Sequence, residues 1–182
     1  MNFIEFYESE QPLYHDTNVF VDMDGVLCDF DGVITKALQK QAYTQITPRD
    51  IYEFFTEGNA AAFFEHLPKF PQADLLIKFI IRKFGKYDIC SRPLKFRPVE
   101  SIVGKNLWID QNLNYKPKNR YFTFHKEEYA TTDGKPNILI DDLDENISAW
   151  ESAGGIGIQY DASFNSVEEV VKRIEKVLVK VE

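Results

Sequence analysis

The order of apolar segments in this 182-residue chain predicts an α/β fold with a parallel sheet flanked by helices. Short apolar runs alternate along the chain with longer segments whose apolar residues recur every three or four positions. Polar side chains directly follow four of the short runs. In an open parallel sheet the carboxyl ends of the strands form one edge, and ligands bind there. The same pattern therefore predicts both the fold and the position of a site.

The short apolar runs supply the expected strands. We expect five, at residues 19–21, 87–90, 121–124, 137–140 and 156–160. Because helices separate them, their crossover connections should be right-handed.

Start and stop signals mark the expected helices. They lie over residues 33–42, from Pro71 to Gly85, from Pro98, from Asp144 to Gly154, and from Ser166. Proline suits a first helical turn, where its missing N–H is not needed, and glycine suits the end of a helix. Ser166 and Glu169 have the spacing of a capping box.

Apolar spacing also predicts which helix faces are buried. In the second helix, the inward residues are expected to be Leu75, Leu76, Phe79, Ile80 and Phe84. In the helix after Pro98, they are expected to be Val99, Ile102, Val103 and Leu107. The stretch 44–70 is rich in phenylalanine and is interrupted by proline, which favours short helices and loops.

Length and composition restrict the class of protein. A chain of 182 residues fits one domain with a small insertion, and 44% hydrophobic residues are enough for a packed core. The formal net charge of -8 disfavours binding to an extended nucleic acid, but it allows a small phosphate ester held locally by a metal. Two cysteines, no secretory signal and no membrane-length apolar run favour a reduced, cytoplasmic protein without a membrane partner. The oligomeric state stays open, with a homodimer among the states allowed.

The polar residues at the strand ends form one chemical set. Asp22 and Asp24 follow the first strand, Ser91 the second, Lys126 the third, and the pair 141–142 the fourth. Carboxylates without histidine or cysteine suit Mg²⁺ rather than Zn²⁺, while a lysine and a hydroxyl can hold phosphate oxygens. Each acid alone could instead cap a helix or close a turn. Structural caps need no common edge, so the whole set favours a site.

In this order, the motifs resemble the haloacid dehalogenase (HAD) superfamily of aspartate-nucleophile phosphatases. The resemblance covers Asp22-Met-Asp-Gly25, Tyr87-Asp-Ile-Cys-Ser91, Lys126, and Ile138-Leu-Ile-Asp-Asp142. It implies a Rossmann-like core formed by residues 1–30 and 71–182, with a small, mainly helical cap over residues 31–70. It also implies a Mg²⁺ cofactor and a small phosphomonoester as the substrate.

Several segments are similar to a narrower family, the 5'(3')-deoxyribonucleotidases. They are Asp22-Met-Asp-Gly-Val-Leu-Cys-Asp-Phe30, Ala62-Phe-Phe-Glu-His-Leu67, Ile89-Cys-Ser-Arg-Pro93, Gly104-Lys105 with Trp108, and Thr123-Phe-His-Lys126. Arg92 departs from that family, which usually has a small hydroxyl residue there. Together with Lys95 and Arg97, it makes the loop basic. This loop is either solvated or a further contact to phosphate.

The resemblance implies a role for each matching residue. Asp22 would be the nucleophile and Asp24 the general acid and base, while Ser91 and Lys126 would hold the phosphoryl oxygens. Mg²⁺ would be held by the Asp22 carboxylate, the Asp24 backbone carbonyl and Asp142, with Asp141 orienting metal-bound water. Substrate contacts are expected from Phe30, Phe63, Phe64, Arg92 and Lys95. The three aromatic residues could alternatively belong to the core of the cap.

The leading hypothesis is therefore a nucleotidase that dephosphorylates nucleoside monophosphates through an aspartyl-phosphate. One alternative keeps the chemistry and changes the substrate to another small phosphomonoester or a polynucleotide end. Another is a catalytically silent HAD-like module used for binding, although every motif residue is present.

Overall fold

A computed structural model describes residues 14 and 16–178 of the chain. Its main sheet is parallel, with the strand order β3-β2-β1-β6-β7. These strands are β1 (Val19–Val21), β2 (Asp88–Ser91), β3 (Arg120–Phe122), β6 (Ile138–Asp141) and β7 (Ile156–Gln159). The predicted α/β class is confirmed, and each predicted strand lies within two residues of an observed one.

Seven α-helices accompany the sheet in the described residues. They are α1 (Phe30–Ala37), α2 (Pro48–Glu57), α3 (Ala60–Glu65), α4 (Ala73–Phe84), α5 (Pro98–Asn112), α6 (Asp144–Ser152) and α7 (Val167–Leu178). Two 3₁₀ turns, η2 (Tyr43–Gln45) and η3 (Lys126–Tyr129), and a small hairpin of β4 (Thr131–Thr132) and β5 (Lys135–Pro136) were not expected. None of the helices in these residues is long and apolar enough to cross a membrane.

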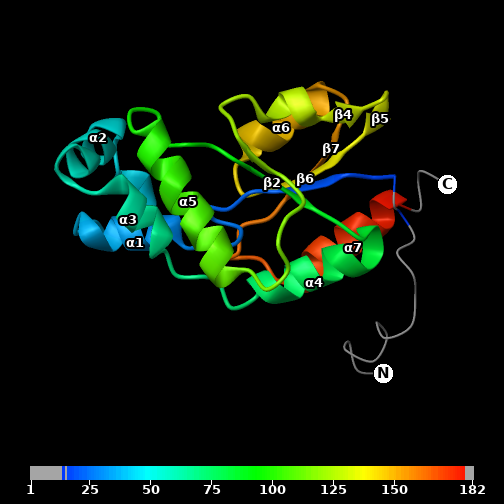
Figure 1. Ribbon diagram of the computed structural model, residues 1–182, viewed down its shortest axis with the longest axis horizontal. Helices are drawn as coiled ribbons and strands as arrows, with labels where there is room; N and C mark the ends of the chain where they lie inside the picture. The colour runs from blue at the N-terminus through cyan, green and yellow to red at the C-terminus, as the bar shows by residue number, and fades with distance from the viewer. Residues whose placement is uncertain (1–13, 15, 179–182) are drawn as a thin grey trace.

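Helices cover both faces of the sheet, which explains why its central strands are continuously apolar (Figure 1). Successive strand side chains point to opposite faces. In β1, Val19 and Val21 join the larger core with residues of α4, α5 and α7. Phe20 points the other way, where its ring packs edge-on against Trp150 of α6 at a centroid distance of 5.3 Å.

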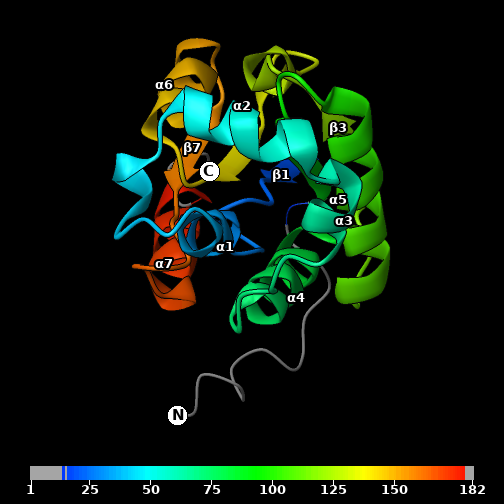
Figure 2. The same ribbon diagram turned by 90° about the vertical axis from the view of Figure 1, so that its left-hand side faces the viewer.

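The helices α1, α2 and α3 gather at one end of the molecule, in front of β1 in the view of Figure 2. Apart from Phe30, the first residue of α1, they lie in the 31–70 segment that we expected to form a cap, and we keep the name cap for residues 31–70. The helix α1 begins at Phe30, where Asp29 caps it by accepting a hydrogen bond from the Gly32 N–H. The helix ends at Ala37 rather than residue 42, and Gln39 then adopts a left-handed φ of 54°. Phe30 and Asp31 therefore lie in the first turn of α1.

The expected buried face of α5 is wrong. Val99 is 70% exposed, and Val103 and Leu107 are also exposed. The residues that face inward are Ser101, Gly104, Lys105, Trp108 and Ile109. This face is selected by close packing against α3 and by the polar partners of Lys105, neither of which an apolar pattern reveals. In α4, Leu75 is likewise exposed, whereas the other four predicted residues are buried.

Candidate active site

A tight turn after β1 positions the two leading aspartates. The Asp22 N–H donates to the Ile140 carbonyl, which extends the pairing of β1 with β6 by one residue. The N–H groups of Leu27 and Cys28 then donate back to the Met23 carbonyl. Gly25 lies in this turn with a φ of +76°. The turn holds both acids at the carboxyl end of the central strand.

Lys126 lies beside Asp22, at the start of η3 and just after β3. Its ammonium group is buried, 3.0 Å from Asp22 Oδ1, and donates a hydrogen bond of 2.6 Å to Asp141 Oδ2. Burial alone would lower the pKa of Lys126, but Asp22 and Asp141 raise it above its ordinary value. The lysine is therefore charged throughout the physiological range.

Asp22 is a buried carboxylate that stays ionised. Burial alone would raise its pKa, but the charges of Lys126 and Lys105 and a hydrogen bond from Ser91 lower it below the ordinary value. The atom Asp22 Oδ1 accepts no hydrogen bond from the described residues, although Lys126 is close by. An ionised carboxylate whose oxygen accepts no hydrogen bond can act as a metal ligand or a nucleophile.

Lys105 of α5 is a site residue that the sequence analysis did not select. Its fully buried ammonium group donates to Asp24 Oδ2 at 2.7 Å, to Ser91 Oγ at 2.7 Å and to the Arg92 carbonyl at 2.8 Å. The resemblance of Gly104-Lys105 to the nucleotidase family was the signal that could have identified it. The apolar pattern of α5 predicted a different inward face, and Lys105 does not lie on that predicted face.

Asp24 lies across the site from Lys126 and is paired with Lys105. Burial raises its pKa, and the neighbouring ammonium group of Lys105 opposes that rise. Its side chain keeps 27% of its surface exposed, so it remains open to the pocket. A carboxyl group with a raised pKa at the mouth of a site suits proton transfer.

The two acids after β6 differ in their surroundings. Asp141 is fully buried and accepts hydrogen bonds from Lys126, the Leu143 N–H and Asn146. Asp142 faces the pocket, and burial together with Asp22 and Asp141 raises its pKa to about 9. Asp141 thus holds the Lys126 ammonium group in place. The ionised form of Asp142 is disfavoured by its surroundings, and a bound cation would stabilise that form.

The residues at this edge fit Mg²⁺. Carboxylate oxygens of Asp22, Asp141 and Asp142 lie within 4.8 Å of one another, with no histidine or cysteine in the group. Asp22 Oδ1 accepts no hydrogen bond from the described residues and has only the ion pair with Lys126, so its lone pairs can still serve a metal. The Asp24 carboxylate lies outside this group because it pairs with Lys105, so only its backbone carbonyl remains as the expected ligand. Hard oxygen donors in this number are typical of Mg²⁺ sites.

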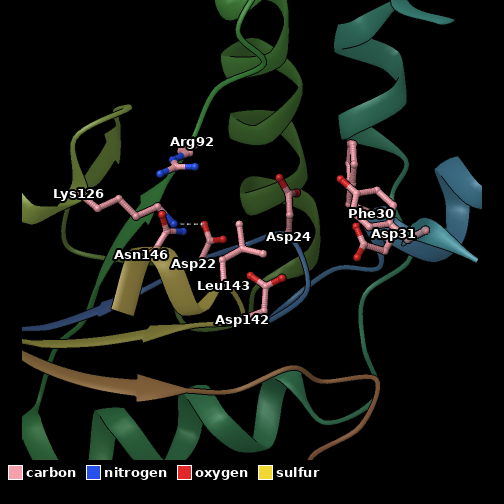
Figure 3. A pocket seen from close by; sticks show the side chains of 10 residues that line it. Asp22, Asp24, Phe30, Asp31, Arg92, Lys126, Asp142, Leu143 and Asn146 are labelled. Atoms are coloured by element: carbon pink, nitrogen blue, oxygen red, sulfur yellow. Dashed lines mark ion pairs between the residues drawn. The ribbon is translucent and has the colours of Figure 1, made fainter. Parts of the chain in front are cut away.

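Asp22, Asp24, Lys126 and Asp142 line a cavity of about 130 Å³ at the carboxyl end of the sheet, whereas Ser91, Lys105 and Asp141 lie behind its lining (Figure 3). Its lining residues are Asp22, Asp24, Phe30, Asp31, Tyr43, Arg92, Lys126, Asp142, Leu143 and Asn146. Lys126 and Arg92 lie at one end, and Phe30 and Asp31 of the cap lie at the other, beyond Asp24. The cavity therefore has a cationic end and a cap end.

Two of the expected substrate contacts lie behind the cavity rather than in its lining. Phe63 and Phe64 pack against Phe30 with ring-centroid distances of 5.7 Å each, within a cluster of phenylalanines. Among these three, Phe30 alone is a lining residue of the cavity. The alternative interpretation, in which the rings form the core of the cap, accounts for Phe63 and Phe64.

The three basic residues of the loop after β2 have different surroundings. Arg92 lines the cavity, and its guanidinium group forms a 2.6 Å ion pair with Glu145. Lys95 lines a separate, open groove with Arg92, Pro93 and Phe124. Arg97 pairs with Glu100 and donates to the Thr56 carbonyl of the cap. Of the three basic residues, only Arg92 reaches the site.

The sequence matches no protein-family model and no curated protein sequence. Several solved structures are similar to this chain at low sequence identity. A HAD family enzyme from Bacteroides thetaiotaomicron, an aspartate-to-alanine mutant in complex with magnesium and inorganic phosphate, has a TM-score of 0.52 and 18% identity, covering 82% of this chain and 96% of that one. A haloacid dehalogenase-like hydrolase from Streptococcus pneumoniae has a TM-score of 0.50 and 16% identity, with 79% and 83% covered. This chain has the HAD-like α/β fold.

A second hydrolase from Streptococcus pneumoniae is similar over nearly its whole length. It has a TM-score of 0.50 and 14% identity, and the match covers 89% of this chain and 98% of that chain. At such low identity the comparison establishes the HAD-like fold alone.

Proposed function

We propose that this protein is a Mg²⁺-dependent phosphomonoester hydrolase that forms an aspartyl-phosphate intermediate. The observation that carries the proposal is Asp22, a buried carboxylate with a lowered pKa whose Oδ1 forms an ion pair of 3.0 Å with the charged Lys126 and accepts no hydrogen bond from the described residues. A carboxylate in that state is a competent nucleophile, and its cationic neighbour can hold the phosphoryl group it attacks.

In the first step, an Asp22 oxygen attacks phosphorus in line, and the bond from phosphorus to the ester oxygen breaks. Lys126 and Ser91, which both contact Asp22, hold the phosphoryl oxygens. Asp24 donates its proton to the departing oxygen. Lys105 already contacts both Ser91 and Asp24, so it couples the phosphate-holding side of the site to the proton donor.

In the second step, water attacks phosphorus, and the bond to Asp22 breaks. Asp24 takes the proton from the water, which restores the starting state and releases phosphate. Mg²⁺, held by Asp22, Asp142 and the Asp24 carbonyl, would neutralise the charge that develops on the phosphoryl oxygens. Asp141 keeps Lys126 in place through its 2.6 Å hydrogen bond.

For the substrate, we propose a nucleoside monophosphate, as in the 5'(3')-deoxyribonucleotidases. The support is the resemblance of the motif segments together with the ring of Phe30 in the cavity wall, since an aromatic face or edge suits a base or sugar. Arg92 adds a cation at the phosphate end of the cavity.

A second candidate substrate is a smaller phosphomonoester, and the size of the cavity favours it. Its volume of about 130 Å³ is below the range of about 300–1,000 Å³ typical of sites that enclose a drug-sized ligand. Phosphate and a few further atoms would fill it. A nucleotide would extend beyond it towards the cap.

The first test compares the wild type with Asp22→Asn in phosphate release from p-nitrophenyl phosphate, with and without Mg²⁺. We expect Mg²⁺-dependent turnover in the wild type and a loss of at least about a thousandfold in the variant, because an amide cannot attack phosphorus. Asp133→Asn, on the exposed hairpin turn away from the site, is the matched control and should keep full activity. Circular dichroism shows whether each variant is folded. Turnover retained by a folded Asp22→Asn protein would remove Asp22 as the nucleophile.

The second test is a panel of nucleoside monophosphates and small sugar or polyol phosphates under the same conditions. A preference of tenfold or more in kcat/KM for either group decides between the two substrate candidates. Absence of hydrolysis of every ester with any divalent metal would contradict the proposed reaction and favour a binding module.

A further inference from the structure

Asp31 is the one acid of the cavity lining that the proposed reaction does not use. It lies in the first turn of α1, half-buried, at the cap end of the cavity and beyond Asp24 (Figure 3). Within the described part of the chain, its carboxyl group has no hydrogen bond or ion pair with the protein. The N-terminus of α1 favours a negative charge there, but the carboxyl oxygens of Asp31 still lack a hydrogen-bond donor that a bound molecule could supply.

The surroundings of Asp31 indicate what would complete it. The charged groups that act on it are Asp24, Asp161 and Asp29, all acidic, and with burial they raise its pKa to about 7. Tyr43 of η2 lines the same end, and its ring contacts Phe30 edge-on at 6.3 Å. This end of the cavity therefore offers a carboxyl group, a phenol and an aromatic wall, with no cation among these residues.

Position relates this end to the reaction. An in-line attack by Asp22 sends the departing group away from Asp22, past the proton donor Asp24. In the view of Figure 3, Asp31 lies beyond Asp24 as seen from Asp22. A hydrogen-bond donor on the departing alcohol would then meet the free carboxyl group of Asp31, whereas an anionic group there would face two or more acids.

We propose that Asp31, assisted by Tyr43, is a specificity-determining residue that selects phosphomonoesters whose leaving group carries a hydroxyl or N–H donor close to the ester oxygen. The inference rests on the proposed function and deepens it by naming the class of leaving group. It excludes leaving groups with a carboxylate or a second phosphate at this position. It applies to a nucleoside and to a small polyol alike, because both supply hydroxyl donors.

The experiment uses three esters with related three-carbon leaving groups: glycerol 1-phosphate, propyl phosphate, and glyceric acid 3-phosphate. The ratio of kcat/KM for glycerol 1-phosphate to that for propyl phosphate measures donor selection. In the wild type at pH 8.5, where Asp31 with its pKa of about 7 is ionised, we expect a ratio of about ten or more, since a hydrogen bond to a carboxylate is stronger than one to a neutral acceptor. The carboxylate-bearing ester should be the poorest substrate.

Asp31→Asn keeps the shape of the side chain and removes its charge. We expect the ratio to fall by about tenfold, and turnover of glyceric acid 3-phosphate to rise relative to propyl phosphate. Tyr43→Phe should lower the ratio by a smaller factor. Glu53→Gln, an exposed acid on α2 of the same cap, is the matched control and should leave both ratios unchanged.

The outcomes separate this inference from the proposed function. An unchanged ratio in a folded, active Asp31→Asn protein would overturn the inference, and so would an equal loss with all three esters. If the wild type hydrolyses no ester, the proposed function fails and the inference falls with it. A tenfold fall that is confined to the donor-bearing ester supports both.

Discussion

At the scale of single residues, Gly25 explains why a glycine follows the paired aspartates. Its φ of +76° is a left-handed conformation that side chains disfavour. A Cβ atom there would also lie 2.5 Å from Asp142 Oδ2 and 3.0 Å from Asp142 Cβ. The glycine therefore serves both the turn and the placement of the acid on the neighbouring strand.

Gly25→Ala should damage the site more than the fold. We expect a loss of about 1–2 kcal/mol in the free energy of unfolding from backbone strain, and at least about a hundredfold loss in kcat/KM because Asp142 is displaced. The control is Gly134→Ala, which has the same φ of +76° but nothing within 4 Å of the added Cβ. This control should show a similar loss in the free energy of unfolding, measured by urea denaturation, and keep its activity. Equal activity losses in the two variants would contradict this account.

The sequence predicted those residues of the candidate site that lie at or near the end of a strand, because the end of a strand specifies where a residue lies. Asp22 directly follows β1, Ser91 is the last residue of β2, and Lys126 comes four residues after the end of β3. Parallel strands bring their carboxyl ends together whatever the details of packing. Lys105 lies in the second turn of a helix, so its position depends on which face of α5 is turned inward. Phe63 and Phe64 were expected to contact the substrate but lie outside the cavity lining. Sequence spacing could not reveal this, because an aromatic residue in a core and one in a pocket have the same spacing.

At the scale of elements, the contact between α3 and α5 connects the cap to the catalytic edge. Gly104 lies against the backbone of α3, where a Cβ would overlap the Ala61 carbonyl oxygen and lie 2.9 Å from Phe64 Cβ. Lys105 follows directly and enters the site. The distance between these helices therefore determines how far Lys105 reaches, which the apolar spacing of α5 could not reveal.

Gly104→Ala should push α3 away from α5. We expect a loss of about 1–3 kcal/mol in the free energy of unfolding, as for other overpacked contacts, with a lower kcat because Lys105 moves from Asp24 and Ser91. Val103→Ala is the control, one position away on the exposed side of the same helix, and should change stability by about 0.5 kcal/mol or less. Urea denaturation and steady-state kinetics measure both effects. A Gly104→Ala protein as stable and active as the control would contradict this prediction, because it would show that α3 and α5 can separate at little cost.

At the scale of the whole molecule, acids outnumber cations in the chain, and the excess extends into the site. The net charge is -8, and Asp22, Asp24, Asp31 and Asp142 all line one cavity. This excess of acids affects Asp142 directly. Burial and the charges of Asp22 and Asp141 raise its pKa to about 9. The folded protein therefore holds a proton on Asp142 that the unfolded chain releases near its ordinary pKa of 3.8. Its contribution to stability is fully present below pH 3.8 and is lost as the pH rises towards 9.

Mg²⁺ should reverse this loss, because a bound cation favours the ionised form of Asp142 and must displace its proton. We expect Mg²⁺ to raise the melting temperature, and to raise it more at pH 8.5 than at pH 6, since binding at the lower pH has to remove the proton first. Thermal unfolding with MgCl₂ measures this, with NaCl at equal ionic strength as the control for screening of the net charge. In Asp142→Asn, which carries no proton to displace and lacks a ligand, the difference between the two pH values should vanish. An equal Mg²⁺ effect at both pH values in the wild type would show that Asp142 is already ionised without the metal.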